Sequence, residues 1–321
     1  MPKRLTEHED GPTQKYMLRC FGGLSDCKLI ELLKLLRQRP ELVDKDCVSR
    51  RTMERYDETE YERHIACSAQ LQMKKGPPWK LDLADPLLLM RFFSERTESY
   101  RTLLDIVAAK YPPGHIYRGV WYYDEATPGA VLRIDNKRKF WGVYFALAEF
   151  GEALSREAAW VPVAVLRTDI CKSIAGGFSQ AIGKAVDASK HSFTVGVTIV
   201  LPSTGATPFR ATFSINFADE AALEIATDFK GASGVLPCMK CKNVMYNRAL
   251  RAIAAGDYCV GLDCTVFARF DLRTDQDMWD AIDHLMVCRV TMGVGNFKEE
   301  EKIYGLGCNP HGFFFNVAES S

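Results

Sequence analysis

Two stretches of the chain place adjacent carboxylates where a β-strand is expected to end. In "WYYDEATPG", Asp124 and Glu125 follow aromatic residues, and in "FSINFADEAA", Asp219 and Glu220 lead into a predicted helix. Carboxylates at the ends of neighbouring strands can converge on one point, and Mg²⁺ and Mn²⁺ prefer such oxygen ligands. Two such ions can promote phosphodiester cleavage. The alternative is structural, because acids form turns and Asp219 could cap the helix.

A cysteine pair is the second candidate site. In "LPCMKCKNV", Cys238 and Cys241 have the CxxC spacing of many zinc sites. Structural zinc takes four ligands, so two more are needed. The candidates are Cys259 and Cys264, or Cys308 and His311. The alternative is a reduced pair of thiols in a turn. His64, His191 and His284 have no evident partners and are interpreted as structural.

Charge is distributed unevenly although the formal net charge is zero. Residues 229–256 contain five basic residues and no acid, whereas residues 257–321 contain eleven acids and five bases. The five bases are Lys230, Lys240, Lys242, Arg248 and Arg251. Such a segment predicts a local basic face that could contact the phosphate backbone of DNA.

The first hundred residues are predicted to be helical. "LSDCKLIELLKLLRQRP" has Ser25 as an N-cap and a wide apolar stripe, and "SRRTMERYDETEYERH" is compatible with a solvated helix. "GPPW" marks a break and a candidate linker. A further helix begins at Asp85-Pro86, an N-cap acid before proline, and runs to about Lys110 with an interruption near Ser94.

From Ile116 onward the pattern favours strands. "IYRGVWYY", "KFWGVYFAL" and "WVPVAVLRT" are short, aromatic and β-branched, and a helix over "FSQAIGKAVDASK" follows them. "SFTVGVTIVL" and "PFRATFSINF" predict two strands joined by a turn. "ADEAALEIATDFKG" and "DQDMWDAIDHLMVCRVTM" predict helices, "GLDCTVFARFDL" could be a strand, and the glycine-rich end is expected to be irregular. The order predicts a mixed-sheet α/β domain behind a helical region.

The two acids and the cysteine pair together carry a family resemblance. The strand-end acid, the "FADEAA" motif and "KGASGVLPCMKCKN" resemble the RNase H-like catalytic core of Kyakuja–Dileera–Zisupton-type DNA transposases, over about residues 115–311. The resemblance implies an RNase H-like mixed sheet with flanking helices in residues 113–321, with a zinc-knuckle-like insertion at about 229–265. Residues 1–112 would form the helical N-terminal region. Asp124 and Asp219 would be the first two catalytic acids.

The resemblance also implies DNA cleavage and strand transfer with Mg²⁺ or Mn²⁺, and a structural Zn²⁺ at the cysteine pair. A third acid is expected on a later helix, but none of the acids on the predicted C-terminal helix lies in a matching motif. These are Asp275, Asp277, Asp280 and Asp283. The chain ends soon after "NPHGFFFN", so a shortened, catalytically incomplete copy is expected.

Two other kinds of protein fit the same residues. One is a non-enzymatic, zinc-containing module that binds nucleic acid or another partner, and the other is a small-molecule metalloenzyme. The polar N-terminus has no apolar signal segment, and no apolar run approaches the length of a membrane span. Eleven cysteines without a signal segment favour reduced thiols. We therefore expect an intracellular protein, nuclear or cytoplasmic, with no membrane partner.

Overall fold

A mixed five-stranded sheet forms the centre of the molecule. The computed structural model describes residues 65–126, 139–245, 259–260 and 267–314, so both helices expected before residue 65 lie outside the described residues. The strand order is β5-β4-β3-β7-β6. The strands are β3 (Ile116–Ala126), β4 (Phe140–Leu147), β5 (Val161–Arg167), β6 (Val197–Leu201) and β7 (Gly205–Phe217). The predicted α/β class, the three-strand run and the strand pair are confirmed.

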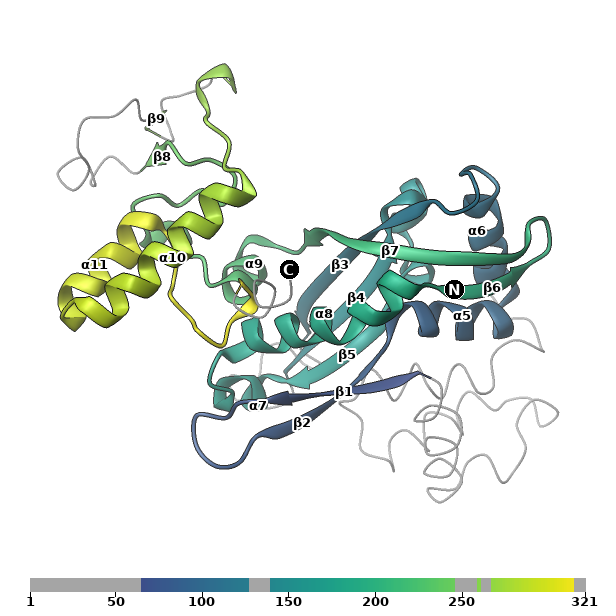
Figure 1. Ribbon diagram of the computed structural model, residues 1–321, viewed down its shortest axis with the longest axis horizontal. Coiled ribbons are helices and arrows are strands. Elements are labelled where there is room, and N and C mark those ends of the chain that lie inside the picture. The colour runs from purple at the N-terminus through teal and green to yellow at the C-terminus, as the bar shows by residue number, and fades with distance from the viewer. Residues whose placement is uncertain (1–64, 127–138, 246–258, 261–266, 315–321) are drawn as a thin grey trace, which may run out of the picture.

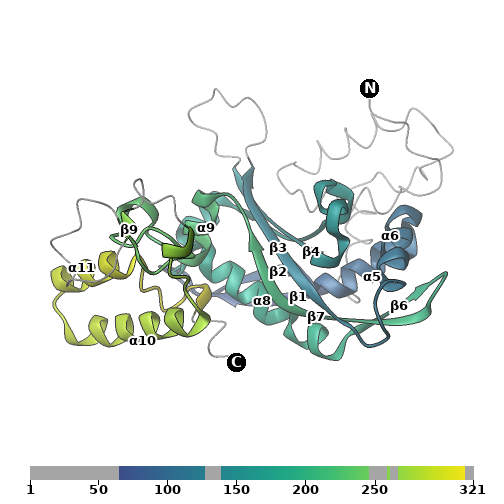
Figure 2. The same cartoon turned by 90° about the horizontal axis from the view of Figure 1, so that it is seen from above.

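Strand pairing brings two distant segments together. β3 pairs with β4 in the antiparallel sense and with β7 in the parallel sense, so β3 is the central strand. β6 and β7 form a hairpin, with β6 at one edge and β5 at the other. The carboxyl ends of β3 and β7 therefore lie next to each other, at the same end of the two strands (Figure 2).

A long helix packs on the aromatic residues of one face of the sheet. Successive side chains of a strand point to opposite faces, and Trp121 lies opposite Phe145 on the neighbouring strand. Helix α8 (Gly177–Val195) covers this face. The ring of Phe178 stacks on Trp141 with centroids 4.4 Å apart, and Phe193 packs against Phe145 at 5.3 Å. These contacts belong to the main hydrophobic core.

The segment before the sheet differs from the predicted helical region. β1 (Ala66–Leu71) and β2 (Trp79–Ala84) form an antiparallel hairpin, and the "GPPW" stretch lies at its turn instead of forming a linker. The helix prediction is confirmed beyond it, in α5 (Pro86–Arg96) and α6 (Glu98–Ala108). Asp85 caps α5 through a hydrogen bond from the Leu88 amide, as its sequence predicts. Both helices contribute to the same core as the sheet.

Short elements complete the described part of the main body. The 3₁₀ helices η4 (Ala148–Ser155) and η5 (Glu157–Ala159) connect β4 to β5, and α7 (Thr168–Ser173) precedes α8. Helix α9 (Glu220–Thr227) follows β7 as predicted, and it ends at Asp228 with a left-handed φ of 58°. Beyond it come η6 (Gly231–Ser233), β8 (Val244–Met245), β9 (Cys259–Val260) and η8 (Phe267–Arg269).

A helical pair forms the C-terminal end, on the opposite side of the sheet from α6 (Figure 1). It consists of α10 (Asp275–Thr291) and α11 (Val294–Tyr304). Helix α10 is as predicted, with a capping box between Thr274 and Asp277. The prediction of an irregular glycine-rich end is wrong, because that end contains α11. The first half of "GLDCTVFARFDL" lies outside the described residues, and the second half contains a 3₁₀ turn and no named strand. A small separate core stabilises the pair, built on Phe229, Ala281, Leu285 and Leu306.

Candidate functional site

Asp124 and Asp219 lie at the carboxyl ends of neighbouring parallel strands. Tyr122 of β3 is in register with Phe217 of β7, and each aspartate comes two residues after its strand's member of that pair. Both aspartates are exposed. The two strands are thus neighbours, as the metal-site hypothesis requires. Their pairing places the two acids at the same end of the sheet.

The phenol of Tyr122 is hydrogen-bonded to one of the two carboxylates and is influenced by the charge of the other. Its hydroxyl donates a hydrogen bond to Asp124 Oδ2 at 3.2 Å. Burial raises the pKa of Tyr122, and the negative charges of Asp124 and Asp219 raise it further. The charges of both carboxylates thus act on the ionisation of one phenol.

Asp219 also has the structural role considered as the alternative. Its Oδ1 accepts a hydrogen bond of 2.7 Å from the Ala222 amide, which makes it the N-cap of α9. This bond engages one carboxylate oxygen, and the hydrogen bond from Tyr122 engages one oxygen of Asp124. The second oxygen of each aspartate has no hydrogen bond within the described residues. The cap and a metal ligand are compatible roles for Asp219.

The two neighbouring glutamates do not join the aspartates. Glu125 lies on the opposite face of β3 from Asp124, where it accepts hydrogen bonds from Thr168 Oγ1 at 2.8 Å and Lys139 Nζ at 2.9 Å. Burial raises the pKa of Glu125, but these hydrogen bonds outweigh burial and lower it. Glu220 is exposed in the first turn of α9, and its charge acts on Glu224.

A third carboxylate is not brought to the aspartate pair by any described residue. No third Asp, Glu, His or Cys forms a compact metal-ligand group with Asp124 and Asp219 in the part of the chain that the structure describes. Among the acids on α10, Asp277 completes the capping box and Asp280 accepts a hydrogen bond from Gln276 at 2.7 Å. The third catalytic acid that the resemblance implies is therefore not found among the described residues.

The cysteine pair lies in a loop held by the segment before α10. Cys241 forms an isolated β-bridge with Leu272, and the Lys242 amide donates to the Asp271 carbonyl at 2.9 Å. Burial lowers the pKa of the Arg273 guanidinium, and Cys238 is close enough for its charge to oppose that effect. The segment before α10 therefore places a half-buried cation beside the cysteine loop, where Arg273 Nε also donates to the Cys241 carbonyl at 3.3 Å.

The expected zinc ligands are only partly described. Cys308 and His311 form no three-ligand group with Cys238 and Cys241 within the described residues, so this combination is not assembled. Cys308 Sγ instead contacts Met286 Sδ at 3.5 Å. For Cys259 only the backbone is described, paired with Val244, and Cys264 lies outside the described residues.

The basic segment is partly neutralised by acids from the C-terminal helices. Lys230 Nζ is 3.1 Å from a Glu301 carboxylate oxygen, and Lys242 Nζ is 3.3 Å from Asp277. Lys240 is exposed. Arg248 and Arg251 lie outside the described residues. Counting charges along the sequence could not reveal these ion pairs, because the acid lies 71 positions from Lys230 and 35 positions from Lys242.

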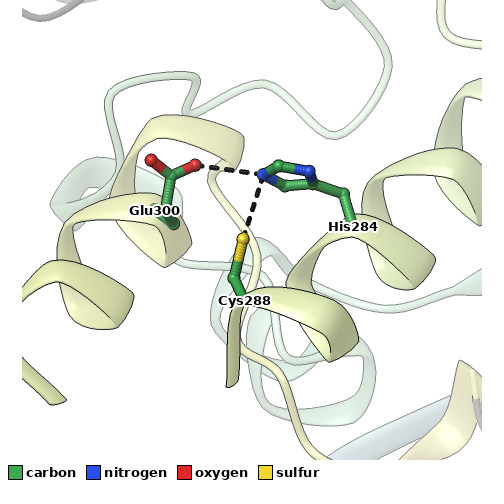
Figure 3. A group of neighbouring side chains, drawn as sticks. All are labelled: His284, Cys288 and Glu300. Carbon is green, nitrogen blue, oxygen red and sulfur yellow. Dashed lines mark hydrogen bonds and ion pairs between the residues drawn. The ribbon is translucent and has the colours of Figure 1, made fainter. Parts of the chain in front are cut away.

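A group of three potential metal ligands lies between α10 and α11. His284 and Cys288 come from α10 and Glu300 from α11, with their ligand atoms all within 4.8 Å of one another (Figure 3). His284, which the sequence led us to interpret as structural without naming a partner, thus has two partners, Cys288 and Glu300. The four-residue spacing of His284 and Cys288 on a predicted helix was the available signal, because it places both on one face.

Comparison with known proteins adds no assignment. Neither a scan against protein-family models nor a search of curated proteins finds a match for the chain. None of the described helices is long and apolar enough to cross a membrane. The functional argument therefore depends on the geometry of the described residues.

Proposed function

We propose that the chain is a transposase-derived, RNase H-like domain that cleaves DNA at a divalent-metal site formed by Asp124 and Asp219. One observation carries the proposal: these two aspartates end adjacent parallel strands, although 95 positions separate them (219 − 124). Strand ends are rigid positions from which side chains can be held at a fixed separation.

The donor set suits Mg²⁺ or Mn²⁺. Both ligands are carboxylates, each has one oxygen outside the hydrogen bonds described above, and both are exposed, so water can complete the coordination. When bound, such an ion lowers the pKa of a coordinated water and stabilises a departing phosphate oxygen. Tyr122 holds Asp124 in place through its hydrogen bond, and the first turn of α9 holds Asp219.

Aromatic side chains beside the aspartates support a nucleic acid as the substrate. The ring of Tyr122 lies 5.8 Å from Tyr144 and 5.6 Å from Trp160, and all three side chains are only partly buried. Unpaired bases stack on such surfaces without sequence preference. The same rings also pack the η5 end against the sheet, so they stabilise the fold as well.

A second candidate is a non-enzymatic binding module. It is favoured by the N-cap role of Asp219 and by the absence of a third ligand around the pair among the described residues. In this case Asp219 would be a helix cap alone, and the aromatic surface would bind a partner without chemistry.

Nicking of supercoiled DNA in Mg²⁺ or Mn²⁺ distinguishes the two candidates. Asp124→Asn and Asp219→Asn are the informative variants, because asparagine preserves an acceptor for Tyr122 and is as good an N-cap as aspartate. Glu220→Gln is the matched control, since it removes a neighbouring exposed carboxylate. The proposal predicts metal-dependent nicking that both asparagine variants lose and the control retains. Equal activity in wild type and both asparagine variants, or none in any protein, would exclude it.

A further inference from the structure

His284, Cys288 and Glu300 are outside the proposed DNA site and have a different chemistry. His284 and Cys288 are one helical turn apart on α10, and Glu300 faces them from α11. Figure 3 shows the imidazole, the thiol and the carboxylate pointing toward the same space between the two helices. Cys288 is buried at 2% exposure, whereas the side chains of His284 and Glu300 are 42% and 26% exposed. The group is thus anchored inside and open to solvent on one side.

The distances are close to those of a metal-bound group. His284 Nε2 lies 3.2 Å from Cys288 Sγ and 3.2 Å from Glu300 Oε2. Tetrahedral zinc with typical bond lengths separates nitrogen from sulfur by roughly 3.5 Å and nitrogen from oxygen by roughly 3.4 Å. Both distances from His284 Nε2 are thus within a few tenths of an ångström of the zinc values, and all three ligand atoms lie within 4.8 Å of one another.

A nucleophilic cysteine triad does not fit this geometry. In such a triad one ring nitrogen of histidine faces the nucleophile and the other faces the carboxylate. Here the same nitrogen, Nε2 of His284, faces both the sulfur and the carboxylate oxygen. Three potential ligand atoms thus face one another with Nε2 between the other two, and a cation that binds all three would satisfy them together.

The ligand types select the kind of cation. Nitrogen and sulfur donors favour Zn²⁺ over Mg²⁺ or Ca²⁺. A thiolate and a carboxylate together balance the two positive charges of the ion. Three protein ligands leave a fourth position for water or for a further residue.

The packing of α11 gives an independent reason for a cross-link. Helix α11 buries none of its residues, and the small core beneath it has only four buried members. Small structural units of this kind commonly depend on a metal to fix their elements. We propose that His284, Cys288 and Glu300 bind a Zn²⁺ ion that links α11 to α10.

Zinc binding by the full chain tests this site separately from DNA cleavage. Metal-free protein is titrated with Co²⁺, whose sulfur-to-metal absorption reports thiolate ligation, and zinc stoichiometry is measured after dialysis against Zn²⁺. Cys288→Ser and Glu300→Gln are the test variants, and Glu300→Gln changes only a partly exposed residue. The matched control is the double variant Cys238→Ser, Cys241→Ser, which removes the other cysteine pair.

The proposal predicts that wild type binds one more zinc ion than Cys288→Ser. Glu300→Gln should lower the affinity for that ion by about tenfold or more, and its helical circular dichroism should remain that of wild type. The control should keep this ion and its cobalt–thiolate absorption. The same zinc stoichiometry and cobalt spectrum in wild type and both test variants would overturn the proposal. Loss of all zinc in the control alone would overturn it as well.

Discussion

The carboxyl group of Asp228 connects α8, the end of α9 and the C-terminal segment. Ser179 Oγ donates to its Oδ2 at 2.7 Å, and Asn309 Nδ2 lies 3.1 Å from both carboxylate oxygens. The Gly307 amide also donates to the Asp228 carbonyl at 2.7 Å. Burial raises the pKa of this carboxyl from 3.8 to about 6, although the two side-chain hydrogen bonds oppose the effect.

Asp228→Asn should remove a pH dependence of stability. Between pH 3.8 and about 6 the folded state holds a proton that the unfolded state releases. The free energy of unfolding therefore decreases as the pH rises through this window. The difference between the two pKa values corresponds to about 3 kcal/mol. Asparagine carries no charge and tolerates the left-handed φ of 58°, so the variant should lack this loss and be at least as stable as wild type at pH 7.5.

Urea unfolding followed by tryptophan fluorescence at several pH values between 4 and 7.5 measures the effect. Glu152→Gln, which removes an exposed carboxylate far from this junction, controls for the change in net charge. The reasoning is refuted if wild type gains stability relative to Asp228→Asn as the pH rises. That result would mean that the hydrogen bonds from Ser179 and Asn309 favour the ionised form more than burial disfavours it.

Three further predictions concern the fold and the zinc site. Asp85→Ala should lower the free energy of unfolding by about 1 kcal/mol because α5 loses its N-cap, and Asp85→Ser should retain most of the wild-type stability because serine is also a good N-cap. Tyr123→Phe should raise that free energy by about 1 kcal/mol, since the buried hydroxyl has no hydrogen-bond partner among the described residues; a loss of similar size would contradict this. Zinc should raise the Tm of the full chain at pH 8 and much less at pH 5, because protons compete for the ligands; a pH-independent effect, or one retained in Cys288→Ser, would argue against the site.

Local signals predicted much of the central fold. Asp85 followed by proline marks a helix start through chemistry within four residues, and the described helix begins there. The strands around Trp121 and Phe145 were predictable because aromatic and β-branched runs favour a buried sheet. The sequence could not predict that β3 pairs with β7. Parallel strands are joined by a crossover of many residues, so no local signal indicates which strands become neighbours.

Other elements lacked a readable local signal. Helix α11 buries no residue, so it shows no apolar periodicity, and its glycines favoured an irregular interpretation. The β1–β2 hairpin was missed because the proline-containing turn resembles a linker. The pairing of Lys230 with Glu301 and the meeting of Glu300 with His284 both depend on tertiary contacts between separate segments.

Mn²⁺ binding to wild type, Asp124→Asn, Asp219→Asn and the double variant tests the central claim most directly. Electron paramagnetic resonance of free Mn²⁺ gives the number of bound ions and their affinity. If the two aspartates share an ion, each single variant should lose the same ion, and the double variant should lose no more than either single one. Unchanged Mn²⁺ binding in both single variants, or losses that add in the double variant, would contradict a shared metal site at the ends of β3 and β7.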